Sequence, residues 1–345
     1  MKEVLGSEIS EPPLVTSYQA LLQNNDFHSH LKTESIVVQE IDLPVINLYN
    51  IQSENREKRR LCAEEIVKAA SEWGFFQVLN HGISLQLLEE IKREQVKLFR
   101  LPFEKKVSSG ILNDSYRWGN PTAVSVDQFS WSEAFHVPLD KISDEDCNHG
   151  EFSSLRELMK NLGMAMSNLG RALADVLVQN LGYSCGNFPK NCDEKTCFLR
   201  LNRYPPCPFS RPETGAACGL VSHTDSDYLT ILYQDHVGGL QVMKDSRWVA
   251  VRPNRNALIV NIGDLFQVSI FFISSFIYFT FCSLHLQFVR FQLIYIIYIL
   301  TPQSSVYCKF KNLNLGWVLN LGHFSPTKCK ANPSLIKLVH YWATW

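Results

Sequence analysis

The chain has 345 residues, of which 46% are hydrophobic and 19% are charged, and its formal net charge is −1. This composition is typical of a globular protein, and the balanced charge excludes the basic field with which nucleic-acid-binding proteins attract phosphates. Ten cysteines show neither a Cys-x-x-Cys pair nor zinc-ligand spacing, so reduced thiols are favoured over a disulfide framework.

Residues 1–40 are predicted to form a flexible leader with one helix near Leu14 to Leu22. The first residues, Met1 to Pro13, are polar and acidic, and they lack the apolar stretch of a secretory signal. We therefore expect a cytoplasmic protein, with the nucleus as a second compartment.

The region 41–150 begins with a short strand at Leu43–Leu48, and a charged helix follows from Ser53. A strand over Trp73–Gly82 ends in a turn, where His81 is interpreted as a turn residue rather than a metal ligand. Ser84 is predicted to cap the next helix. The polar and aromatic stretch 109–135 has little periodicity, which favours a long loop that lines a substrate pocket.

The region 151–197 is dominated by one long amphipathic helix and a connector. Apolar residues recur at steps of three and four between Leu155 and Leu181, which predicts a helix whose apolar face packs on a sheet.

The region 198–267 contains short strands separated by turn signals. Leu199 to Tyr204 alternates and is stopped by Pro205 and Pro206, since proline cannot continue a hydrogen-bonded ladder. The following strands are predicted at 228–234, 237–242, 247–251 and 257–264. Short strands at this spacing favour an α+β fold, a double-stranded β-helix or jelly roll with flanking helices.

The sequence Ser-His-Thr-Asp-Ser-Asp lies at the centre of this region. His223 and Asp225 are two positions apart, so in an extended segment both side chains point to one side. A histidine with a carboxylate makes two-thirds of the facial triad that binds non-haem Fe(II). Asp227 is a second carboxylate that could take the place of Asp225.

Several motifs in this order resemble the plant 2-oxoglutarate/Fe(II)-dependent dioxygenases, which share the isopenicillin-N-synthase-like jelly roll. They are Asn-x-Tyr-Pro-Pro-Cys-Pro, His-Thr-Asp, Leu-Thr-Ile-Leu-Tyr-Gln-Asp, Gly-Gly-Leu-Gln-Val and Asn-Ile-Gly-Asp-Leu-Phe-Gln. The resemblance extends from about Leu43 to Gln267. Within the family, the segments Ser115–Gly119 and Phe129–Pro138 look most like gibberellin 2-oxidases that act on C20 gibberellins.

The resemblance implies Fe(II) as cofactor and 2-oxoglutarate as co-substrate, while a requirement for ascorbate is not decided by the sequence. It implies that His223 and Asp225 are metal ligands and that Tyr204, with Asn202 on the same strand face, contacts 2-oxoglutarate. The second histidine of the family and its Arg-x-Ser motif are missing. His285 and His323 are the remaining histidines after the matched region, and neither lies in a matching neighbourhood.

The composition changes abruptly after Gln267. The segment 268–345 contains no Asp or Glu, and Phe, Ile, Tyr and Leu crowd the stretch 270–300. A membrane anchor at 270–284 would be shorter than the ~20 residues of a clean span. Because Val268-Ser269 can be encoded by a consensus intron donor, we interpret the tail as a translated retained intron and the jelly roll as C-terminally incomplete.

The implied function is hydroxylation of a gibberellin at the 2β position, with O2 and a small diterpenoid as substrates, and no nucleic-acid or membrane partner. Without the second histidine and the Arg-x-Ser motif, we expect impaired turnover. Two alternatives stay open: oxidation of another metabolite, such as a flavonoid, by the same fold, and a truncated product without activity.

Overall fold

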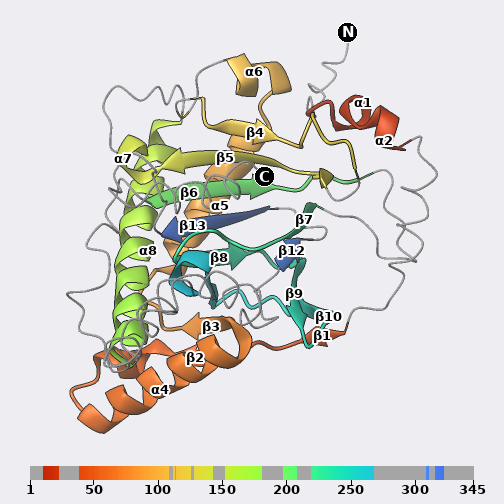
Figure 1. The fold of residues 1–345 in the computed structure, drawn as a ribbon. Coiled ribbons are helices and arrows are strands. Elements are labelled where there is room, and N and C mark those ends of the chain that lie inside the picture. Colours follow the sequence, from red (N-terminus) through yellow and green to blue (C-terminus); the bar gives the residue numbers. More distant parts are fainter. Residues whose placement is uncertain are drawn as a thin grey trace, which may run out of the picture.

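Two sheets face each other in this computed structural model (Figure 1), which describes residues 11–22, 39–108, 112, 114–125, 128–142, 152–180, 197–207 and 219–267, together with the strands 308–310 and 315–321. Among these residues, the larger sheet has the strand order β2-β3-β11-β8-β13-β6-β5-β4. The smaller sheet has the order β1-β10-β9-β12-β7. Among the described strands, the chain passes from one sheet to the other at each step from β6 to β13, except at the β9–β10 hairpin, and this confirms the predicted jelly roll.

The strands are short, as the turn signals predict. In the larger sheet they are β2 (Val45–Asn47), β3 (Phe75–Leu79), β4 (Tyr116–Trp118), β5 (Glu133–Pro138), β6 (Cys197–Arg203), β8 (Leu229–Gln234), β11 (Leu258–Ile262) and β13 (Leu315–Leu321). In the smaller sheet they are β1 (Glu40–Ile41), β7 (Leu220–His223), β9 (Leu240–Lys244), β10 (Arg247–Val251) and β12 (Cys308–Phe310). The stretch 109–135, expected to be a loop, therefore also contributes β4 and the start of β5.

The helices of the described residues are α1 (Leu14–Ser17), α2 (Gln19–Leu22), η1 (Leu48–Gln52), α4 (Arg56–Trp73), α5 (Leu85–Phe99), α6 (Phe103–Ser108), α7 (Leu139–Ile142) and α8 (Ser153–Asn180). Helices α4, α7 and α8 pack against strands of the larger sheet, whereas α1 and α2 belong to the amino-terminal segment. The predicted cap is present, because the Ser84 hydroxyl accepts a hydrogen bond from the Leu87 N–H at 3.1 Å. The helix expected from Ser53 begins instead after Asn55, whose side chain accepts from the N–H groups of Glu57 and Lys58.

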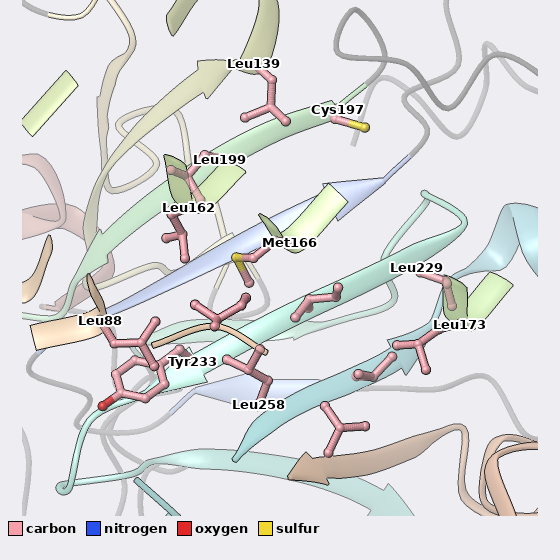
Figure 2. Packing of buried hydrophobic residues seen from close by; sticks show 14 of the residues in the cluster. Leu88, Leu139, Leu162, Met166, Leu173, Cys197, Leu199, Leu229, Tyr233 and Leu258 are labelled. Atoms are coloured by element: carbon pink, nitrogen blue, oxygen red, sulfur yellow. The ribbon is translucent and has the colours of Figure 1, made fainter. Parts of the chain in front are cut away.

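One apolar core lies between the larger sheet and the helices, and a second lies between the two sheets. In the first, side chains of α8 such as Leu162, Met166 and Leu173 meet Leu199 and Leu258 of the sheet (Figure 2). The second, inside the jelly roll, is formed by Leu43, Phe75, Tyr204, Leu232, Leu240, Val242, Val251 and Ile259. Residues of β6, β8 and β11 thus alternate between the helix-facing core and the jelly-roll interior.

Two strands of the tail lie within the sheets. β12 lies between β9 and β7, and β13 lies between β8 and β6. We predicted a jelly roll that is incomplete at its C-terminal end, and at these two positions the tail supplies strands that the prediction did not include. Ladder hydrogen bonds join backbone groups, so an apolar segment can pair with an open strand without carrying the family's side chains. The remainder of the tail, including 270–300, lies outside the described residues, as do residues 143–151 and the connector that follows the long helix, residues 181–196.

A buried ionic cluster joins the amino-terminal segment to the larger sheet. The Lys106 ammonium lies 2.5 Å from Oε2 of Glu133, and both side chains are fully buried. The Tyr116 hydroxyl donates to the same oxygen at 2.5 Å, and Arg203 pairs with the other Glu133 oxygen and with Glu11. The cluster thereby fixes α6, β4, β5 and β6 relative to one another. Within the described part of the chain, no helix is both long and apolar enough to cross a membrane.

Candidate metal and 2-oxoglutarate site

The predicted histidine and carboxylate lie together at the end of β7. The strand ends at His223, and Asp225 follows in the irregular segment before β8. Nε2 of His223 is 3.6 Å from Oδ1 of Asp225, and the two side chains are 32% and 15% exposed. Both groups are therefore partly open to a ligand. The pair is adjacent as predicted, although only its first residue is in a regular strand.

Asp225 is held in place by two neighbouring strands. Its Oδ2 accepts hydrogen bonds from the Thr230 hydroxyl of β8 at 2.6 Å and from the Asn261 side-chain amide of β11 at 2.9 Å. These residues are partners in the β8–β11 register. With Oδ2 occupied, Oδ1 remains as the oxygen that faces His223. Sequence reasoning missed both residues, although each is a polar residue at an inward position of an otherwise apolar strand.

A second set of contacts fixes the loop that carries Asp225. The Thr224 hydroxyl donates to Oδ2 of Asp264 at 2.7 Å, and the Asp264 N–H donates to the Asp225 carbonyl at 2.8 Å. A Cβ on Gly263 would lie 1.8 Å from the Asp227 carbonyl oxygen, so only glycine allows this approach. Burial raises the pKa of Asp264, the Thr224 hydrogen bond opposes that rise, and the charge of Asp225 adds to it.

The donor types at His223 and Asp225 fit Fe(II), which is bound in proteins by imidazole and carboxylate groups. The geometry favours Asp225 over Asp227, because the Asp225 oxygen faces the imidazole while Asp227 is buried. Among the described residues, no group of three or more His, Cys, Asp or Glu side chains is arranged to hold a metal ion. The strand beside β7 is β12, in which Cys308 pairs with His223, and both His285 and His323 lie outside the described residues.

Asn202 and Tyr204, the residues expected to contact 2-oxoglutarate, lie in the jelly-roll interior. Each is 4% exposed. Tyr204 lies just after β6 and packs on Gly219, where an added Cβ would come within 2.4 Å of the tyrosine ring. Asn202 accepts a hydrogen bond from Nε of Arg200 at 2.7 Å. The structure gives both residues a common location, and their contact with 2-oxoglutarate stays a prediction.

The segment expected to line the pocket lies beside this location. The Trp131 indole N–H donates to the Pro206 carbonyl at 3.2 Å, and the Ser130 hydroxyl donates to the Gly219 carbonyl at 3.4 Å. Phe129 and Trp131 also form an apolar cluster with Leu14 and Tyr18 of the amino-terminal segment. His81, by contrast, serves a turn: its Nδ1 accepts from the Ile83 N–H at 3.2 Å.

Comparison with known proteins gives a consistent result. Residues 195–275 match the 2OG-Fe(II) oxygenase superfamily, and residues 43–161 match the non-haem dioxygenase in morphine synthesis N-terminal family. Gibberellin 2-beta-dioxygenase 6 of Oryza sativa subsp. japonica is 51% identical over 272 residues, covering 74% of this chain and 75% of that protein. Gibberellin 2-beta-dioxygenase 8 of Arabidopsis thaliana is 47% identical over 266 residues, covering 74% and 76%.

Solved structures show the same fold at lower identity. The structure of JOX2 in complex with 2OG, Fe and JA is 23% identical, with a TM-score of 0.60, and the match covers 92% of this chain and 86% of that one. A dioxygenase for auxin oxidation from Arabidopsis thaliana, solved with 2-oxoglutarate, is 23% identical, with a TM-score of 0.58 and coverage of 85% and 97%.

Proposed function

We propose that this chain, which belongs to the family of 2-oxoglutarate/Fe(II)-dependent oxygenases, hydroxylates a gibberellin at the 2β position. The observation that carries the proposal is the 51% identity to a gibberellin 2-beta-dioxygenase over three-quarters of both chains. The relatives named 1-aminocyclopropane-1-carboxylate oxidase are more distant, the first of them 34% identical over 235 residues. Such a reaction would inactivate a hormone, and we place it in the cytoplasm.

The chemistry of the family is the oxidative decarboxylation of 2-oxoglutarate to succinate and CO2, coupled to replacement of a C–H bond by C–OH. Fe(II), when bound, brings O2, 2-oxoglutarate and the substrate carbon together. His223 and Asp225 would hold it through one imidazole nitrogen and one carboxylate oxygen. Thr230 and Asn261 orient that carboxylate, as outer partners of metal ligands commonly do.

The rest of the site would position the organic molecules. Asn202 and Tyr204 present an amide and a phenol inside the jelly roll, suited to an oxygen-rich co-substrate. Within the stretch 109–135, the side chains of Ser130 and Trp131 donate to the carbonyls of Gly219 and Pro206, beside Tyr204. The apolar cluster of Phe129 and Trp131 with Leu14 and Tyr18 lies beside these contacts, and such a surface would suit a rigid, largely apolar diterpenoid.

The test is incubation of the purified chain with Fe(II), 2-oxoglutarate, ascorbate and either a C20 or a C19 gibberellin. Mass spectrometry would detect the hydroxylated gibberellin, and a separate assay would measure succinate. The proposal predicts product from a gibberellin and none from a flavonoid such as naringenin. Loss of product in the His223→Ala and Asp225→Ala variants, with unchanged thermal unfolding, would place the reaction at this pair. Hydroxylation of the flavonoid and not of the gibberellin would reject the proposed substrate.

A further inference from the structure

The jelly-roll interior contains an arginine, Arg200, that forms no ion pair among the described residues. Arg200 lies on β6 at the same face as Asn202, and its Nε donates to the Asn202 side-chain oxygen at 2.7 Å. The side chain is partly buried, and the other N–H donors of the guanidinium have no partner among the described residues. Arg203 on the same strand differs, because it is already paired with Glu11 and Glu133. A partly buried guanidinium with spare donors is suited to an anion.

The strand register relates the position of Arg200 to that of Thr230, which holds Asp225. β13 pairs with β6 on one side and β8 on the other, so residues opposite the same β13 position lie at one level. Phe198 is level with Thr230, which holds Asp225, and Arg200 is level with Leu232. Successive positions on one face of a strand are about 7 Å apart. Along β6, Arg200 therefore lies about 7 Å beyond the level of Thr230, the residue that holds Asp225.

A second observation, at the level of Asn202 and Gln234, also indicates a ligand. Gln234 of β8 is 3% exposed, and within the described part of the chain neither its amide nitrogen nor its amide oxygen has a hydrogen-bond partner. It occupies the same face of β8 as Thr230 and is level with Asn202. The β13 residue between the two is Gly316, which has no side chain. Because an unpartnered buried amide is costly, a polar ligand that lies over Gly316, between the side chains of Asn202 and Gln234, would satisfy it.

From these observations we propose that Arg200, with Asn202 and Gln234, forms a carboxylate-binding seat inside the jelly roll. Two molecules of the reaction can supply the carboxylate: 2-oxoglutarate, through the group distant from its keto carbon, and a gibberellin, which is itself an acid. The seat offers the counter-charge for which the family's Arg-x-Ser motif is absent from this sequence. Only the gibberellin source rests on the proposed function; the 2-oxoglutarate source rests on the family and the geometry.

The experiment is calorimetric titration of the full chain, without oxygen and with Mn(II) in place of Fe(II). The probes are 2-oxoglutarate, its analogue 2-oxopentanoate without the distal carboxylate, a gibberellin and that gibberellin's methyl ester. The variants are Arg200→Gln and Arg200→Lys, with Arg247→Gln, an exposed arginine of β10, as the matched control. Thermal unfolding of each variant separates loss of binding from loss of folding.

Arg200→Gln is expected to weaken binding of one carboxylate probe by tenfold or more, which is the usual contribution of a charge-assisted hydrogen bond. The same variant should no longer distinguish that probe from its partner without the carboxylate. Arg200→Lys should retain part of the discrimination, and Arg247→Gln should retain all of it. If Arg200→Gln binds 2-oxoglutarate and 2-oxopentanoate equally, the carboxylate comes from 2-oxoglutarate. If it binds the gibberellin and its methyl ester equally, the carboxylate comes from the gibberellin.

Three results would overturn the proposal: binding of both acids unchanged in a folded Arg200→Gln, equal binding of acids and carboxylate-free analogues by the unaltered chain, or no binding of either acid. A chain that binds 2-oxoglutarate through Arg200 but neither binds nor hydroxylates a gibberellin would instead reject the proposed substrate and leave the seat in place.

Discussion

Replacing Glu133 by glutamine tests the ionic cluster that holds β6 in position. The Glu133 carboxylate is fully buried and accepts from Lys106 and Tyr116, each at 2.5 Å, as well as from Arg203. Glutamine is neutral and exchanges one acceptor oxygen for an NH2 group. Lys106, also fully buried, would then lose its negatively charged partner and keep neutral contacts, among them the Phe99 carbonyl at 3.3 Å and the Tyr116 ring, whose centroid is 5.3 Å away.

The expected loss of stability follows from this uncompensated charge. Removing one partner of a buried ion pair costs about 3–5 kcal/mol. For a domain of about 150–250 residues, each kcal/mol corresponds to roughly 2–4 °C in Tm, and we take this as the upper range for this longer chain. Glu133→Gln should therefore lower Tm by roughly 6–20 °C. Arg203 is less affected than Lys106, because Glu11 still receives two of its N–H groups.

The assay is thermal and urea unfolding of Glu133→Gln, Lys106→Met and the double variant. The double variant should be more stable than the sum of the single losses predicts, since it removes both charges together. Glu57→Gln, which breaks an exposed pair with Arg60, is the control and should leave Tm unchanged. A Glu133→Gln protein as stable as this control, or strictly additive losses in the double variant, would refute the reasoning.

Three further outcomes are expected. Thr230→Val and Asn261→Leu each remove one donor to Asp225, so each should weaken Mn(II) binding by about 10–100-fold with little change in fold; unchanged affinity would show that Asp225 needs no support. Burial raises the pKa of Asp264 above its ordinary 3.8, so the folded state holds that proton more tightly, and stability falls as pH rises from about 3.8 through the raised pKa. Asp264→Asn, which keeps an oxygen for Thr224, should match the unaltered chain in acid and gain on it as pH rises; a constant difference in urea unfolding across pH would contradict this. Replacing 268–345 by a family-type end with His and Arg-x-Ser should raise gibberellin-dependent succinate release, and equal release by the unaltered chain would show that its own tail suffices.

Much of this protein is readable from its sequence because the signals are local. The cap at Ser84, the apolar stripe of α8 and the stop at Pro205 each depend on residues within one element, and the structure confirms them. The adjacency of His223 and Asp225 is also local, since two residues separated by one position cannot be far apart. The order of the motifs identified the family and, through it, the jelly roll.

Tertiary structure decided what depends on strands meeting across the chain. Thr230 and Asn261 orient Asp225 only because β8 and β11 pair in the observed register. Arg200 and Gln234 face the same interior because β13 pairs with both of their strands, and no pattern in the sequence predicted this strand. Side-chain patterns determine which face of a strand is buried, but backbone pairing determines which strands lie beside it, and backbone groups are the same in every non-proline residue.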